Sequence, residues 1–227
     1  MLLLAVDTSG RQGGITLACG GSEQFELIES ASLQGGTFSA ELIPQISELL
    51  SRNRLSPANL QGLVAVTGPG SFTGLRVGLT AVKGLAEALK LPIASVTSLE
   101  VLMAAREKET QRAASPQERD AVIAVLDAGR DEVYAAIHSS RDYEELLLSV
   151  SSAMELAASR NFKVITSDAK LASRFLAADV VEFRSSEVAA ELGARKLHAA
   201  ETVDVLALDA NYIRKSEAEY MQKLKQR

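Results

Sequence analysis

The part of the sequence most able to bind a ligand is a glycine-rich segment, Gly68-Pro69-Gly70-Ser71-Phe72-Thr73-Gly74. It connects a predicted strand over 63–66 to a predicted helix over 73–89. Glycines let the backbone approach a ligand closely, and the free N–H groups at the start of a helix can bind an anion. The segment lacks the Gly-Lys-Ser/Thr of a P-loop and the spacing of the dinucleotide-binding fingerprint. Two interpretations stay open: a phosphate site that includes Gly68, Gly70 and Ser71, and a tight strand–helix connection that binds nothing.

Two aspartates each follow a predicted strand and precede a turn: Asp7, with Thr8 beside it, and Asp127. If the two carboxylates face each other across a cleft, they could hold a hydrated Mg²⁺ beside the phosphates of a nucleotide. Alternatively, each carboxylate accepts hydrogen bonds from its own turn, as Asp often does. Asp7, Thr8 and Asp127 therefore join the glycine-rich segment as candidate nucleotide-binding residues.

The sequence offers no recognisable catalytic group or metal site. The two histidines, His138 and His198, are far apart in the sequence, and the one cysteine, Cys19, lies in an apolar predicted strand. Zinc sites usually draw on clustered His and Cys side chains. Ser71 is not part of the Gly-x-Ser-x-Gly turn that exposes a nucleophilic serine. We therefore predict no catalytic residue and no bound metal.

The composition of the 227-residue chain narrows the class of protein. With 47% hydrophobic and 23% charged residues it is typical of a globular protein and unlike a disordered chain. The net charge of −5 and the 4% aromatic content argue against a protein that binds nucleic acid by itself. A single cysteine suits a reducing compartment, the opening apolar run 1–6 is too short for a signal peptide, and no membrane span is apparent. We expect a cytoplasmic protein.

The predicted elements repeat along the chain. Strands are expected over 2–6, 15–19 and 25–31, forming an antiparallel meander that precedes the helices 38–52 and 73–89.

A polar stretch over 110–120 is the predicted linker, and the chain then starts over. The pattern of a strand, an Asp, small residues, a Gly and an Arg occurs at 5–11 and again at 125–130. We predict an α/β protein with two duplicated domains, 1–112 and 113–227. An alternative in which the last helix packs back on the first domain stays open.

The predicted helix 73–89 is apolar around most of its circumference. One stripe contains Leu75, Leu79, Val82 and Ala86, and a second stripe consists mostly of small residues: Val77, Ala81, Gly84 and Ala88. A helix of this kind is either enclosed by its own fold or shared with a partner. We favour a helix-mediated protein interface, and the fully internal helix stays open.

Several motifs, taken together, resemble the TsaB (YeaZ) family. The most specific is Val66–Gly78, and the others follow the chain from its first strand to its end; they are Leu4–Ser9, Ser39–Pro44, Ser95–Glu100, Asp127–Tyr134 and Asn211–Ser216. The resemblance implies a two-lobed α/β fold of the actin, sugar kinase and Hsp70 (ASKHA) class. It also implies a role in making threonylcarbamoyladenosine (t6A) in tRNA.

The resemblance further implies a non-catalytic scaffold subunit. Such a protein pairs with a TsaD-type transferase, and a TsaE-type ATPase binds to the pair. It contacts tRNA only indirectly, through the complex. ATP or ADP with Mg²⁺ is expected only at the shared interface. The first two main helices would form this interface, with the residues Phe38, Leu42, Leu75, Arg76, Leu79, Val82, Lys83 and Ala86.

Three positions differ from the patterns of related proteins. Ser98 and Leu102 stand where TsaD-like paralogues carry an iron-binding His-x-x-x-His motif, and Phe38 stands where many family members have His. An alternative function is a small ATP-dependent kinase or phosphohydrolase that uses Asp7 and Asp127. A homodimer of the isolated chain is a further expectation, because an apolar helix face can pair with a copy of itself.

Overall fold

The computed structural model describes residues 1–21, 24–112, 121–138, 143–211 and 213, without the side chains of 111, 112 and 138. The chain divides into two compact units. Unit 1 contains residues 1–101 and 184–211, and the described part of unit 2 lies within 102–183 and at residue 213. The division therefore differs from the expected boundary at residue 112, because residues 184–211 belong with unit 1.

Unit 1 is built on a five-stranded mixed sheet with the order β3-β2-β1-β4-β5. The strands are β1 (Leu2–Asp7), β2 (Gln12–Gly20), β3 (Phe25–Gln34), β4 (Gly62–Val66) and β5 (Ile93–Val96). The first three form an antiparallel meander, as predicted, whereas β4 and β5 run parallel to β1. Every residue of β4 is buried, as expected for a strand inside a sheet that helices cover on both faces.

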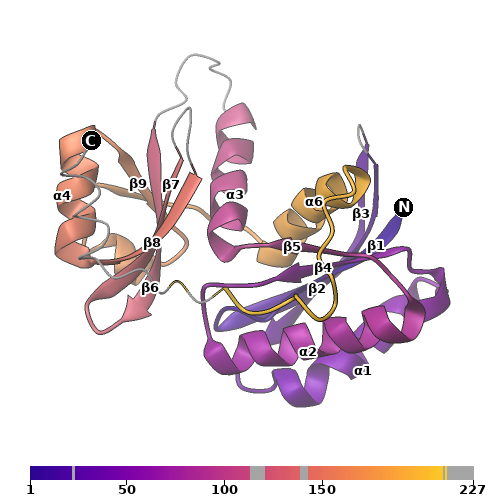
Figure 1. Cartoon of the computed structure of the whole chain (residues 1–227). Helices are drawn as coiled ribbons and strands as arrows, with labels where there is room; N and C mark the ends of the chain where they lie inside the picture. Colours follow the sequence, from indigo (N-terminus) through magenta and orange to yellow (C-terminus); the bar gives the residue numbers. More distant parts are fainter. Residues whose placement is uncertain (22–23, 113–120, 139–142, 212, 214–227) are drawn as a thin grey trace. The chain divides into compact units, whose positions relative to one another are not determined.

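Helices α1 (Phe38–Arg52) and α2 (Phe72–Leu89) cover one face of this sheet, and α6 (Ser185–His198) covers the other (Figure 1). A short 3₁₀ turn, η1 (Pro57–Asn59), leads into β4. The core beneath α1 and α2 combines alternate residues of the strands with the apolar stripes of both helices; it includes Leu4, Val6, Leu63, Ala65, Leu42, Ile46, Leu49, Leu75, Leu79, Val82 and Ala86.

Helix α6 is held to unit 1 by unusually close packing. Gly193 lies against Val64, and any side chain at this position would clash with that valine. Nearby, the buried Thr16 donates a hydrogen bond of 2.8 Å to Ser186 on α6. These contacts explain why a segment from late in the chain completes the first unit.

Unit 2 contains a second five-stranded sheet with the order β10-β9-β6-β7-β8. The strands are β6 (Val122–Gly129), β7 (Glu132–His138), β8 (Tyr143–Ser149), β9 (Lys163–Thr166) and β10 (Ala178–Val180). The helices are α3 (Ser98–Arg112), which starts in unit 1, α4 (Val150–Arg160) and α5 (Ala169–Ala172). One face of the sheet packs against apolar residues of α4 and α5, including Ala153, Leu156 and Leu171.

The two sheets have the same topology. Read from the opposite edge, β8-β7-β6-β9-β10 repeats β3-β2-β1-β4-β5, with the same antiparallel and parallel pairings. Strands β1 and β6 are therefore equivalent, and Asp7 and Asp127 lie near their ends. The prediction of a duplicated α/β fold is confirmed. In the described part of the chain, no helix is both long and apolar enough to cross a membrane.

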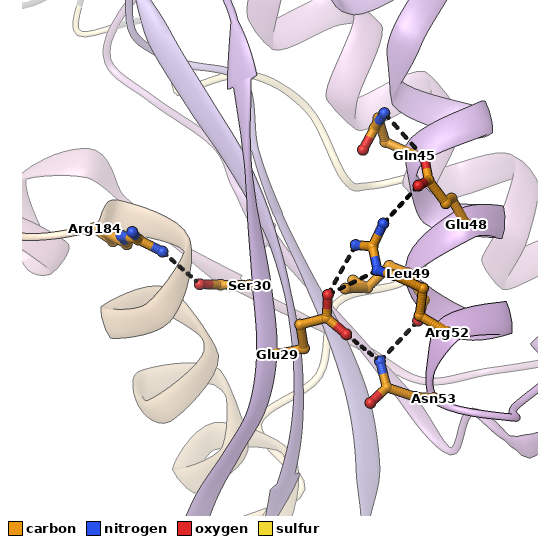
Figure 2. A network of polar contacts seen from close by, with 8 residues as sticks. All are labelled: Glu29, Ser30, Gln45, Glu48, Leu49, Arg52, Asn53 and Arg184. Atoms are coloured by element: carbon orange, nitrogen blue, oxygen red, sulfur yellow. Dashed lines mark hydrogen bonds and ion pairs between the residues drawn. The ribbon is translucent and has the colours of Figure 1, made fainter.

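A polar network ties the end of α1 to β3 (Figure 2). The carboxylate of Glu29 accepts hydrogen bonds from Asn53 at 2.6 Å and from the guanidinium of Arg52 at 2.9 Å, and Arg52 also binds Glu48. The hydrogen bond from Asn53, followed by those from Arg52, lowers the pKa of Glu29.

Glu29→Gln is expected to weaken the protein at neutral pH and to have little effect in acid. Because the folded state lowers the pKa of Glu29, its contribution to stability is present above the ordinary carboxyl pKa of about 4.3 and disappears as the pH falls below it. We expect the melting temperature of Glu29→Gln to lie about 1–2 °C below that of the wild type at pH 7. Thermal unfolding at pH 7 and in acid checks this; a difference that persists in acid would contradict it.

Candidate functional site

The turn after β1 binds to its own neighbours. The side chain of Asp7 is buried, and its Oδ1 accepts a hydrogen bond of 2.8 Å from the backbone N–H of Ser9. The hydroxyl of Thr8, also buried, donates to the backbone oxygen of Gly74 on α2 at 2.8 Å. Both polar side chains are thus engaged inside unit 1.

Gly70, just before α2, and Gly74 and Gly78 within α2 form the surface against which this turn packs. A Cβ atom at Gly70 would clash with the backbone oxygen of Ser9, and one at Gly74 would clash with that of Thr8. One helical turn further on, a Cβ at Gly78 would clash with the Thr8 hydroxyl. The glycines therefore recur every four residues, on one side of the helix, because the β1–β2 turn packs directly against the backbone there.

Backbone N–H groups at the start of α2 already donate hydrogen bonds within unit 1. The N–H of Ser71 donates to the backbone oxygen of Ser9 at 2.6 Å, and that of Gly74 donates to the Ser71 hydroxyl at 3.2 Å. Gly68, which has a φ of +96°, accepts a hydrogen bond of 2.8 Å from the N–H of Ser98. The observed geometry favours a tight strand–helix connection, and the β1–β2 turn occupies the place where a phosphate would approach.

Asp127 lies in unit 2, where its side chain is exposed and accepts a hydrogen bond of 2.9 Å from the N–H of Gly129. Asp127 thus caps its own turn, as Asp7 does. Within the described residues, no three His, Cys, Asp or Glu side chains come together as metal ligands. His198 is exposed at the end of α6, and the side chain of His138 lies outside the described residues. Asp7 and Asp127 belong to different units, and their joint binding of a Mg-nucleotide stays a prediction.

The positions predicted for a partner interface separate into two groups. Six of them are buried in the core of unit 1, with exposed fractions of 5% or less: Phe38, Leu42, Leu75, Leu79, Val82 and Ala86. Their exposure was an incorrect expectation, because the larger apolar stripe of α2 packs onto β1 and β4. Phe38 is similarly enclosed, with its ring against the backbone of Gly13 and Gly74. The two remaining positions, Arg76 and Lys83, lie on the outer side of α2.

The outward surface of the two helices carries apolar side chains of its own. We call it the α1–α2 face and define it by Ile43, Phe72, Arg76, Gly84 and Ala88, all exposed. Ile43 and Phe72 are 54% and 53% exposed, which is unusual for such large apolar side chains. In the second, small-residue stripe of α2, Gly84 and Ala88 are exposed, whereas Val77 and Ala81 are half-buried and pack against the core.

Sequence reasoning missed Ile43 and Phe72 as surface residues. Ile43 follows the core residue Leu42 directly, so its position on the helix already predicts the opposite side. Phe72 was considered only as part of the glycine-rich segment, although it begins α2.

Comparison with known proteins gives one consistent family. The family model described as TsaD, tRNA N6-adenosine threonylcarbamoyltransferase, matches residues 35–188. The tRNA threonylcarbamoyladenosine biosynthesis protein TsaB of Bacillus subtilis is 33% identical over 143 residues, which cover 63% of this chain and 57% of the relative. TsaB of Escherichia coli K12 is 30% identical over 138 residues, which cover 60% and 54%. The chain thus spans about half the length of the curated relatives it matches.

A solved structure supports the fold. YeaZ from Pseudomonas aeruginosa superposes with a TM-score of 0.71 at 22% identity, covering 93% of this chain and 99% of the other. With the two sheets of equal strand order, this likeness confirms the predicted duplicated α/β fold.

Proposed function

Because the chain belongs to the TsaB/YeaZ family of tRNA threonylcarbamoyladenosine biosynthesis proteins, we propose that it is a scaffold subunit that binds a TsaD-type transferase through the α1–α2 face. It stabilises the transferase by helix packing and does not itself catalyse a step of the reaction. A TsaE-type ATPase binds to the pair, and tRNA is bound by the assembled complex. ATP or ADP with Mg²⁺ binds only where the two paralogues meet.

One observation carries this proposal: unit 1 exposes apolar surface on rigid helices. Ile43 and Phe72 lie in α1 and α2, whose inner sides are anchored in the core by Leu42 and Leu75. Gly84 and Ala88, further along α2, allow another helix to approach closely, since neither has a long side chain. Aromatic and aliphatic anchors surrounded by small residues are typical of the centre of a protein interface.

The chemistry of the described residues also supports a binding role. A kinase or phosphohydrolase would depend on Asp7 and Asp127. Each of these carboxylates instead accepts a hydrogen bond from a backbone N–H of its own turn. The glycine-rich segment serves packing in the same way.

We test the proposal by measuring complex formation with the TsaD-type protein of the same organism, using size exclusion with light scattering. The wild type is expected to give a species with the mass of one of each chain. Ile43→Asp is expected to weaken binding about tenfold or more, because a charge would enter a dry contact. The control Leu176→Asp, at a fully exposed position of unit 2, is expected to bind normally.

Two results would contradict the proposal. One is a wild-type mixture that elutes as two separate, unshifted proteins. The other is full binding by Ile43→Asp and Phe72→Asp when circular dichroism shows both to be folded. ATP hydrolysis by the isolated chain, lost in Asp7→Ala, would favour an enzyme instead.

A further inference from the structure

Two positive charges, Arg76 of the α1–α2 face and Lys83 on the same side of α2, find no counterion among the described residues. Arg76 and Lys83 both lie on the outer side of α2, Arg76 exposed and Lys83 half-buried. Neither forms an ion pair with any residue that the structure describes, whereas many other basic side chains do, including Arg52, Arg106, Lys163 and Lys196. In a chain with a net charge of −5, two unneutralised cations on one helix face are notable.

The nearby acidic groups do not neutralise this pair. Glu87, one turn beyond Lys83, is bound by Lys90 at 2.5 Å. Glu41 on α1 is half-buried and has no ion pair with Arg76 or Lys83. The positive charge of both residues therefore stays available to a partner.

Arg76 is held in place by an aromatic ring. Its guanidinium carbon lies 3.9 Å from the centre of the Phe72 ring, one helical turn earlier. A guanidinium stacked on a ring keeps its N–H donors in its own plane, where they remain free for two parallel hydrogen bonds to a carboxylate. The stack also lowers the entropy that Arg76 would lose on binding.

The spacing of the two cations defines what they can recognise. Seven residues along a helix correspond to two turns, about 10.5 Å, so the side chains project from the same side. A partner helix that lies along α2 can meet both only if its own carboxylates have a similar spacing, as at positions i and i+7.

We propose that Arg76 and Lys83 select and orient the partner by pairing with two carboxylates about two turns apart on the helix that covers α2. This inference rests on the proposed function and adds its electrostatic specificity. The apolar side chains of the α1–α2 face then become buried against the partner helix, and the two cations set the register and direction of that helix.

The test measures the association rate of the chain with the TsaD-type protein as a function of salt. Raising the salt from about 0.1 M to about 1 M shortens the Debye length from about 10 Å to about 3 Å. We expect the wild-type association rate to fall about tenfold over this range, and the double variant Arg76→Glu/Lys83→Glu to associate at least about tenfold more slowly at low salt. Replacing two acidic residues spaced by seven on the partner helix with Lys should restore its binding.

The control is the double variant Arg160→Glu/Lys170→Glu. It makes the same change in net charge at two exposed positions of unit 2 that have no ion pair with a described residue. Association within about threefold of the wild type is expected.

The outcomes separate the two proposals. A stable complex whose association is indifferent to salt and to Arg76→Glu/Lys83→Glu overturns this inference and leaves the scaffold role standing. An equal loss in the unit 2 control also overturns it, because the effect would then come from net charge. If the wild type forms no complex at all, both proposals fail.

Discussion

Leu79→Glu is expected to unfold the protein, or to lower its melting temperature by about 10 °C or more. Leu79 is 5% exposed and packs in the core between α2 and the sheet of unit 1. A carboxylate there loses its hydration without gaining a counterion, a change that costs a large part of the few kcal/mol by which folded proteins are stable. Circular dichroism on heating measures the effect.

The adjacent residue provides the control. Thr80 is exposed on the same helix, so Thr80→Glu is expected to melt within about 2 °C of the wild type. A folded Leu79→Glu variant that loses only partner binding would mean that the larger apolar stripe of α2 faces outward after all.

The second large effect is expected from Gly74→Ala. An alanine inside a helix is normally more stable than glycine by about 0.5–1 kcal/mol. At position 74 the added methyl group would clash with the backbone oxygen of Thr8 and press on the ring of Phe38, and a backbone oxygen cannot turn aside. We expect a loss of about 2–4 kcal/mol in the free energy of unfolding, measured by urea denaturation.

Gly84→Ala is the matched control, on the same helix. Nothing lies within 4 Å of the added Cβ, so the ordinary preference of helices for alanine should apply and the protein should gain stability. Equal effects of the two substitutions, in either direction, would contradict the packing role of the glycines.

The regular elements of unit 1 were predictable because their sequence patterns are local. Apolar runs between glycine turns mark β1 and β2, and helical periodicity marks α1, which begins at Phe38 as predicted. The repeated strand–Asp–turn pattern correctly indicated that β6 restarts the topology of β1.

The orientation of α2 could not be predicted in the same way. Its sequence has two apolar stripes, and periodicity does not say which of them meets the sheet. The larger residues Leu75 and Leu79 bury more apolar area, so they pack inward and leave the stripe of Gly84 and Ala88 outside. Six of the eight positions predicted for the interface therefore lie in the core of unit 1, and the interface itself stays a prediction.

The glycine-rich segment was ambiguous for a related reason. Close approach of a backbone is what glycine permits, and the sequence does not reveal whether a ligand or the protein itself makes that approach. Here the partner of the glycines is the turn at Thr8 and Ser9, more than 60 residues earlier in the chain.

The return of residues 184–211 to unit 1 has a consequence for the order of events during synthesis. Residues 102–183 of unit 2 lie between the two segments of unit 1, so the sheet of unit 1 lacks α6 until that stretch has left the ribosome. The unit whose synthesis begins first is therefore not complete until residues 102–183 have been made, and until then the Gly20, Gly62 and Val64 side of its sheet stays uncovered. A nascent chain that stops before residue 184 would expose this apolar surface to chaperones and to aggregation.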